Sequence, residues 1–313
     1  MNETKLELIF DTDFGSDCDD VMALTYLFYA QRHMGVEIKA VTHSQSTPYG
    51  VPAIRGCFRF FGENIPEVGK MTGGPMLDHK DRYCKELSEK FALEEDYEDV
   101  PCAAKVLRKA LASCKNKCVI CAVGHFTNIA ALLESKPDEI SPLDGVELTK
   151  EKCSHFVIMA GKFVEDENGI RTQDWNIRWD VPATRTFFDL SPVPIYVLPS
   201  ETGRDVVTGE CLVRKYGDSN PLTMSFLLWL KDVKGRSSWD PMTAIYAIEG
   251  KREFFSESEK GNITVTDNGT TYFEVSPDGK FVILSKNSEV SDVIGKIEKY
   301  IDECAEAVLS GII

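Results

Sequence analysis

The sequence predicts an α/β fold with an open, mostly parallel central sheet flanked by helices and a small antiparallel β appendage near the C-terminus. Short apolar runs alternate with segments of helical periodicity up to about residue 198, which is typical of βαβ units. After residue 260, apolar runs follow one another around Asp-Asn-Gly and Pro-Asp-Gly turns, which indicates antiparallel strands. No repeat or linker interrupts the chain, so we expect residues 1–313 to form a single domain.

The first strand is expected at residues 5–10, and the helix after it carries Val21, Leu24, Leu27 and Phe28 at helical spacing. Further strands are expected at residues 36–42, 65–68, 118–123, 156–159 and 195–198, with helices at 54–61, 106–111, 128–133 and 183–188. The last third should contain helices at 221–230, 241–248 and 291–309, and antiparallel strands at 263–266, 270–275 and 281–284.

The polar stretch from residue 73 to about residue 100 has weak periodicity. A stretch of this length predicts either a mobile segment that closes over a ligand or an irregular surface region. His79 and Tyr83 are its candidate ligand contacts, with an ordinary surface position as the alternative.

Composition excludes several function classes. With 43% hydrophobic and 27% charged residues, the 313-residue chain can bury a large core. Its net charge of −15 argues against binding to nucleic acid or to an anionic membrane. No apolar run reaches transmembrane length and the N-terminus lacks the apolar core of a signal peptide, so we expect a cytoplasmic protein. The ten cysteines are scattered, which favours reduced thiols.

Five carboxylates follow the first predicted strand within ten residues: Asp11, Asp13, Asp17, Asp19 and Asp20. They lie at the carboxyl end of a strand, where open α/β sheets bind ligands. Like charges this close disfavour joint ionisation, and a hard cation with oxygen ligands, Ca²⁺ or Mg²⁺, relieves the repulsion. The run therefore predicts a metal site.

Three alternatives compete for this run. An EF-hand loop starting at Asp11 would need Glu at its twelfth position, where Met22 stands, and this excludes it. A phosphoryl-transfer site would use Asp11 as nucleophile and Asp13 as acid; Gly15 stands where such hydrolases usually carry Thr or Val, which weakens this alternative without excluding it. Ordinary helix capping explains one or two acids, not five.

The run Asp-Thr-Asp-x-Gly-x-Asp-x-Asp-Asp-x-x-Ala-Leu resembles the N-terminal signature of the inosine-uridine-type nucleoside hydrolases. Stretches at residues 124–130, 159–180 and 238–242 resemble later motifs of that family in the same order. The resemblance implies a nucleoside hydrolase-like fold and an enzyme of nucleoside salvage that hydrolyses the N-ribosidic bond with a Ca²⁺-bound water. It also implies a small-molecule nucleoside as partner and a homo-oligomer, either a dimer or a tetramer.

In the acidic run, the resemblance assigns Asp13 and Asp20 to the metal, Asp13 also to the attacking water as its base, and Asp19 to the ribose hydroxyls. This chain has two residues more than the family's compact loop. Asp17 is left over and is an alternative to either Asp19 or Asp20.

Two further metal ligands follow from the resemblance. Thr127, in Gly-His-Phe-Thr-Asn, would offer its backbone carbonyl to calcium, and Asp240, in Ser-Trp-Asp-Pro-Met, would be the C-terminal carboxylate ligand. Both residue types are also common at helix starts, which is the alternative interpretation of each. His125 stands where the family commonly has Pro and receives no role.

By the same resemblance, Met159, Asn168, Asp174 and Asn176 would line the ribose site. The alternative is that the polar residues among them belong to ordinary turns. Asp174 is shorter than the Glu expected there. The Asn that family members carry after the second strand has no counterpart in residues 43–46, which leaves sugar contacts on that side undefined.

Trp239 is the second catalytic candidate. One branch of the family has a His at this position that can protonate the leaving base, and the purine-specific branch has Trp. An indole is no general acid, so stacking on the base is the available contribution, and a purine preference follows. A packing role is the alternative for this residue. For the whole protein, the alternatives are a nucleoside- or sugar-binding protein that has lost catalysis and, third, a phosphatase.

Overall fold

The computed structural model describes residues 5–74, 81–252, 254–287 and 289–309. The described strands form a ten-stranded sheet in the order β11-β10-β12-β6-β5-β4-β1-β2-β3, with β9 pairing to β12. The strands are β1 (Leu6–Thr12), β2 (Val36–His43), β3 (Glu67–Lys70), β4 (Cys118–Ala122), β5 (Cys153–Met159), β6 (Ile195–Leu198), β9 (Phe255–Glu257), β10 (Gly261–Val265), β11 (Thr271–Val275) and β12 (Phe281–Lys286). A separate two-stranded sheet joins β7 (Val207–Thr208) to β8 (Arg236–Ser237).

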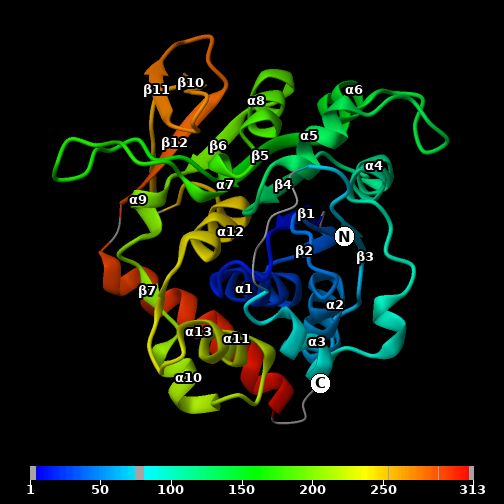
Figure 1. Cartoon of the computed structure of the whole chain (residues 1–313), viewed down its shortest axis with the longest axis vertical. Helices are drawn as coiled ribbons and strands as arrows, with labels where there is room; N and C mark the ends of the chain where they lie inside the picture. The colour runs from blue at the N-terminus through cyan, green and yellow to red at the C-terminus, as the bar shows by residue number, and fades with distance from the viewer. Residues whose placement is uncertain (1–4, 75–80, 253, 288, 310–313) are drawn as a thin grey trace.

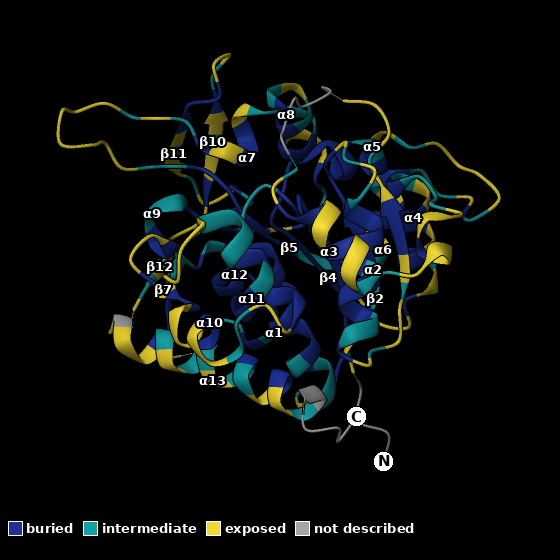
Figure 2. Cartoon of the chain, turned by 60° about the horizontal axis from the view of Figure 1, so that its bottom comes forward, coloured by how far each residue is buried: buried dark blue, intermediate teal, exposed yellow. Residues whose placement is uncertain are grey.

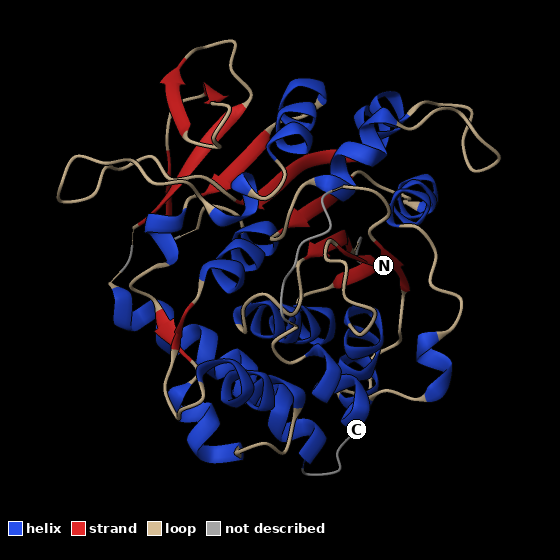
Figure 3. Ribbon diagram, viewed as in Figure 1, coloured by secondary structure: helices blue, strands red, loops and turns tan. Residues whose placement is uncertain are grey.

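Helices lie on both sides of the large sheet (Figures 1 and 3). They are α1 (Asp19–His33), α2 (Gly50–Phe60), α3 (Cys84–Phe91), α4 (Ala103–Ser113), α5 (Thr127–Glu134), α6 (Gly145–Lys152), α7 (Trp175–Arg178), α8 (Val181–Leu190), α9 (Ser200–Gly203), α10 (Glu210–Tyr216), α11 (Pro221–Leu230), α12 (Trp239–Glu249) and α13 (Val290–Leu309), with a 3₁₀ turn at Glu94–Tyr97. None of the helices in the described part of the chain is long and apolar enough to cross a bilayer.

The predicted fold class is confirmed. Strands β1 to β6 pair in parallel, and β10 and β11 form an antiparallel pair. The antiparallel strands are joined to the central sheet, because β12 pairs in parallel with β6 and carries β10 at its other edge. The appendage therefore extends the main sheet.

The two faces of the sheet bury two hydrophobic clusters. Along β1, Leu8 and Phe10 belong to one cluster and Ile9 to the other, as expected for side chains that alternate between faces. Helix α1 packs against α12 and α13 in the first cluster, and α5 packs against α4 and α8 in the second. Figure 2 shows α1 as a buried helix, whereas α13 exposes its outer face.

Several elements differ from the sequence prediction. The long polar stretch contains α3 and the 3₁₀ turn, where a mobile segment or an irregular surface region was expected. Strand β1 continues two residues further, because Asp11 and Thr12 still pair with Thr42 and His43 of β2. Strand β3 begins two residues later than expected, in register with residues 40–43 of β2. Helices α6, α7, α9 and α10 were not predicted; all four have no more than eight residues, and α7 and α9 have only four.

The chain order creates a crevice at the centre of the sheet. From β1 the chain moves outward through β2 and β3, whereas β4, β5 and β6 add to the opposite edge of β1. The loops after β1 and β4 therefore diverge at the carboxyl ends of the two strands, where open sheets bind ligands. Gly124, after β4, lies so close to the β1 loop that a Cβ would sit 2.5 Å from the Asp13 backbone nitrogen and 2.4 Å from Ser44 Oγ. Only glycine permits this approach.

Candidate functional site

A pocket of about 300 Å³ opens at these carboxyl ends. Eight of the ten site residues expected from the sequence line it: Asp13, Asp19, Asp20, Met159, Asp174, Asn176, Trp239 and Asp240. The others in its lining are Ser16, Asp17, Arg82, Val123, Lys162, Gln173, Trp175, Ser200, Arg204, Trp229 and Arg236. Segments from residue 13 to residue 240 thus meet in one place.

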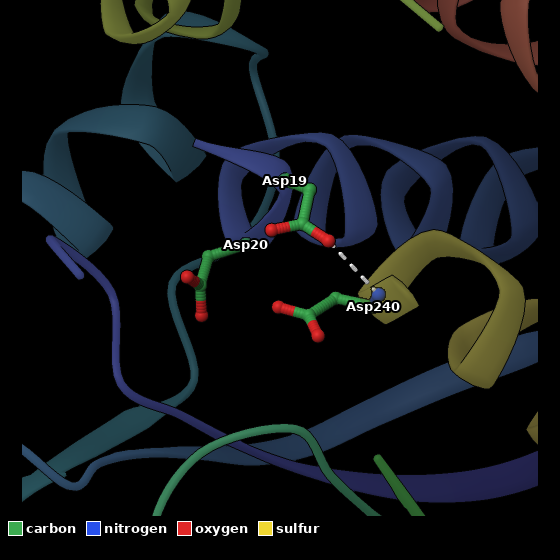
Figure 4. Close-up of side chains that lie close together, drawn as sticks. All are labelled: Asp19, Asp20 and Asp240. Atoms are coloured by element: carbon green, nitrogen blue, oxygen red, sulfur yellow. Dashed lines mark hydrogen bonds between the residues drawn. The ribbon is translucent and has the colours of Figure 1, made fainter. Parts of the chain in front are cut away.

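Three buried carboxylates converge in this pocket. One oxygen each of Asp19, Asp20 and Asp240 can be chosen so that all three lie within 4.8 Å of one another, and Figure 4 shows the side chains pointing toward a common space. Asp19 and Asp20 begin α1, and Asp240 lies in the first turn of α12, so both helices direct their positive ends at the group. The Asp240 backbone N–H donates to Asp19 Oδ2 at 3.1 Å.

The chemistry of this group fits a hard cation. Burial, and then the charges of neighbouring carboxylates, holds the pKa of Asp19, Asp20 and Asp240 well above the usual range. Asp20 Oδ1 accepts a hydrogen bond from Thr12 Oγ1, whereas Asp20 Oδ2 is buried without a hydrogen-bond partner in the described part of the chain. Three carboxylates that burial drives toward the neutral form, with an orphaned oxygen among them, are a donor set for Ca²⁺ or Mg²⁺.

Asp13 lies beside this group and lines the same pocket. Its Oδ2 accepts a hydrogen bond from Ser16 Oγ at 2.5 Å and is 3.5 Å from Nδ1 of His125. Burial raises the pKa of Asp13 to about 7, and the charges of Asp17 and Asp174 add to the shift. Sequence reasoning gave His125 no role; the structure places this buried ring against the candidate base.

Asp17 points elsewhere. Both of its oxygens accept hydrogen bonds from Arg236, at 3.0 Å from Nε and at 2.5 Å from Nη2. Of the three acids that the sequence offered for two roles, Asp19 and Asp20 meet Asp240, and Asp17 forms an ion pair at the rim.

The loop that carries these acids is fixed by side chains from distant segments. The Tyr83 hydroxyl accepts from the Gly15 N–H at 2.8 Å and donates to the Asp17 carbonyl at 2.6 Å. Trp229 Nε1 donates to the Ser16 carbonyl at 2.8 Å, and Nε2 of His43 lies 2.9 Å from the Phe14 carbonyl oxygen. The expectation that Tyr83 contacts a ligand is wrong, because its ring is fully buried beneath the loop. His79 lies outside the described residues.

The loop also depends on one glycine. Gly15 has φ +110, a conformation that side chains rarely adopt, and a Cβ there would lie 2.8 Å from Cys84 Sγ. Glycine is therefore required for the turn that separates Asp13 from Asp17.

Asp174 and Asn176 also line the pocket. Asp174 caps α7 and accepts a hydrogen bond from Ser200 Oγ at 2.6 Å, while burial raises its pKa to about 6. The Asn176 amide group donates to the carbonyls of Val123 at 2.6 Å and Met159 at 3.0 Å. It thereby ties α7 to the ends of β4 and β5.

Two expected residues lie outside the lining. Thr127 begins α5, and its hydroxyl donates to Asp180 Oδ2 at 2.6 Å. Asn168 is exposed in the loop after β5, where its backbone N–H donates to Asp166 Oδ1 at 2.9 Å. The structure does not bring either side chain into the pocket.

The rim of the pocket contains cation–π contacts between arginine and tryptophan side chains, Trp239 among them. The guanidinium of Arg236 lies 4.9 Å from the ring centroid of Trp239 and 4.4 Å from that of Trp229, and Arg82 lies 5.1 Å from Trp229. Trp239 Nε1 donates to the Ser200 carbonyl at 2.7 Å, which fixes the ring. The sequence carried no local signal for Arg82, Trp229 or Arg236, because each comes from a separate segment.

Fold and pocket together define an α/β protein with a buried carboxylate group at the switch point of a parallel sheet. The family model described as inosine-uridine preferring nucleoside hydrolase matches residues 8–297. The chain belongs to this family, as its motifs predict. None of the curated proteins compared with it matches.

Solved structures show the same fold. A purine-preferring ribonucleoside hydrolase from Gardnerella vaginalis gives a TM-score of 0.72 at 16% identity, covering 96% of this chain and 99% of that one. A plant nucleoside hydrolase, PpNRh1, gives 0.71 at 18% identity, with 95% and 99% covered. The type III effector protein XopQ, complexed with adenosine diphosphate ribose, gives 0.67 at 16% identity, with 96% and 94% covered.

The first testable prediction concerns the support of the acidic loop. Tyr83→Phe should lower the free energy of unfolding by about 1–3 kcal/mol, because the Gly15 N–H and the Asp17 carbonyl lose a buried partner. Urea denaturation measures this. Tyr97→Phe is the matched control, since Tyr97 is 42% exposed, and it should change stability little. Equal stability of the two variants would contradict the role given to the Tyr83 hydroxyl.

Proposed function

We propose that the protein hydrolyses the N-ribosidic bond of nucleosides, purine nucleosides preferentially, to ribose and free base. The observation that carries the proposal is the convergence of Asp19, Asp20 and Asp240 in one pocket, with Asp13 beside them. The family to which the chain belongs supports it.

A calcium ion fits the donor set. Asp20 and Asp240 would hold it, together with Asp13 and the Thr127 carbonyl that the family resemblance adds, and Asp19 stands close enough to share it or to hold ribose hydroxyls. When bound, calcium would supply the positive charge that lowers the pKa of a coordinated water.

Asp13 is the residue best placed to take the proton of that water. Its carboxyl group is buried and lines the pocket beside the three converging carboxylates, a position that suits general base catalysis. Ser16 and His125 limit the orientations of the carboxyl group. As the bond to the base breaks, positive charge develops on the sugar, and the surrounding carboxylates stabilise it. Asp174 and Asn176 would hold sugar hydroxyls that the closed pocket leaves without water.

A second candidate function is nucleoside binding without catalysis. His43 ends the second strand, in the region where family members carry a sugar-contacting Asn, and its buried ring meets the Phe14 carbonyl instead of the pocket. The structurally similar XopQ is described as an effector protein, and its complex contains adenosine diphosphate ribose. Both observations favour a family member in which the pocket is kept and the chemistry is lost.

The release of reducing sugar from inosine separates the two functions. If the protein is a hydrolase, Asp13→Asn should lower kcat by about 10²–10⁴-fold, because it removes a general base. Binding of inosine should weaken far less. Asp166→Asn, an exposed acid outside the pocket, serves as the control. Inosine that binds tightly to the unaltered protein and releases no sugar would assign it to the binding class.

A further prediction concerns calcium. Chelation should lower both activity and the thermal midpoint, because a ligand bound only by the native state stabilises it. Asp20→Ala should weaken calcium binding severely, since it removes one of three converging carboxylates, whereas Asp17→Ala should be milder because Asp17 pairs with Arg236. Calorimetric titration with calcium measures the calcium affinity of both variants. An unchanged affinity in Asp20→Ala would remove that carboxylate from the metal site.

Base preference is a separate prediction. A purine stacked on Trp239 gains roughly 1–3 kcal/mol, by analogy with other base–aromatic contacts. Trp239 lines the pocket, and Arg236 lies 4.9 Å from its ring centroid. Trp239→Ala should therefore lower turnover of inosine far more than it lowers the thermal midpoint. Uridine cleaved as fast as inosine by the unaltered protein would refute the stacking argument and leave the calcium proposal standing.

A further inference from the structure

We propose that the substrate of this pocket is a nucleoside 5′-phosphate, whose phosphate is bound by Lys162 and Arg204. This inference rests on the proposed function, because it places the ribose at the carboxylate group. It changes the substrate class from a neutral nucleoside to an anionic nucleotide.

The first observation is a set of cations in the lining of an acidic pocket. Lys162, Arg82, Arg204 and Arg236 all line it, although the chain carries only 35 Lys and Arg against 50 Asp and Glu. Arg236 is neutralised by Asp17. In the described part of the chain, the other three form no ion pair within 4.0 Å of a carboxylate. Arg204 is exposed and Lys162 is half-buried, so both are accessible to an anion that enters the pocket.

Two of these cations, Lys162 and Arg204, lie next to the short helix α9. The loop that contains Lys162 is tied to α9, because the Ser200 N–H donates to the Gly161 carbonyl at 2.9 Å and the Phe163 N–H donates to Glu201 Oε1 at 3.0 Å. Arg204 follows directly at the end of α9. Both cations are thus connected to the segment that carries Ser200.

Ser200 links this segment to the proposed substrate site. Its hydroxyl donates to Asp174 at 2.6 Å, and its carbonyl accepts from Trp239 at 2.7 Å. Ser200 thus connects Asp174, proposed to bind sugar hydroxyls, to Trp239, proposed to stack on the base. Lys162 and Arg204 line the pocket next to this segment. Lys162 Nζ donates to Thr172 Oγ1, so it keeps two further N–H groups for an anion.

The position of the phosphate on the sugar follows from charge. If the vicinal 2′ and 3′ hydroxyls face the carboxylate group, a phosphate on either would lie against Asp19, Asp20 and Asp240, whose three negative charges one calcium ion neutralises only in part. The 5′ hydroxyl is therefore the position of the sugar to which a phosphate can be attached. Lysine and arginine bind phosphate oxygens through charge-assisted hydrogen bonds, which are stronger than those they would form with a neutral 5′ hydroxyl.

The test compares inosine with inosine 5′-monophosphate on the calcium-loaded protein. Released hypoxanthine is the product common to both, and calorimetry gives their affinities. We expect the nucleotide to bind at least tenfold more tightly and to be the better substrate. Lys162→Met and Arg204→Met should each reduce the ratio of the two affinities roughly tenfold, the effect of one charged hydrogen bond. Lys136→Met, which is exposed and outside the pocket, should leave that ratio unchanged.

The outcomes separate this inference from the proposed function. Hypoxanthine released from inosine, with the nucleotide bound no more tightly, would overturn the inference and support the hydrolase. Tight nucleotide binding that depends on Lys162, without hypoxanthine from either compound, would support the inference and refute hydrolysis. If Lys162→Met and Arg204→Met weaken both compounds equally, the cations only balance the acids of the pocket, and the inference is wrong.

Discussion

Repulsion among buried carboxylates is the constraint on which this structure depends. Asp13, Asp19, Asp20 and Asp240 are all at least 95% buried at the ends of β1, α1 and α12. Removing such groups from water favours their neutral forms, and their proximity adds to that effect. The protein keeps them together by directing two helix N-termini at them and by bonding the loop around them to Tyr83 and other distant side chains. A bound cation would complete this arrangement.

Local sequence patterns predicted much of the fold, because a buried sheet imposes its own signature. Strand β6 and helix α11 lie where the apolar runs placed them, and the antiparallel strands follow their Asn-Gly and Asp-Gly turns. Helix α3 could not be recognised. It spans only eight residues, and three of these, Cys84, Leu87 and Ser88, are buried, too few to stand out as a periodicity. Helices α7 and α9 are single turns of four residues, too short to give a periodic pattern.

The candidate site also contains residues that the sequence could predict and residues that it could not. Carboxylates that follow strands could be found from the sequence, because acidic residues clustered beside an apolar run have few structural explanations. The residues that hold them could not be found. Asp17 and Arg236 are 219 positions apart, and nothing near Arg236 shows that it pairs with the acidic loop. This ion pair holds Asp17 at the rim of the pocket, whereas Asp19 and Asp20 meet Asp240.

The carboxylates and the cations of the pocket stand on different kinds of structural element. The carboxylate group sits on the carboxyl ends of β1 and the starts of two helices, elements that the fold itself fixes. The cations at the rim come from the loop after β5, from α9 and from the segment before α3, which the fold constrains much less. Relatives at 15–18% identity share the sheet and differ over most positions. The position of the carboxylate group is therefore set by the architecture, whereas the cations that we propose to bind a phosphate stand on segments that the architecture leaves free to change.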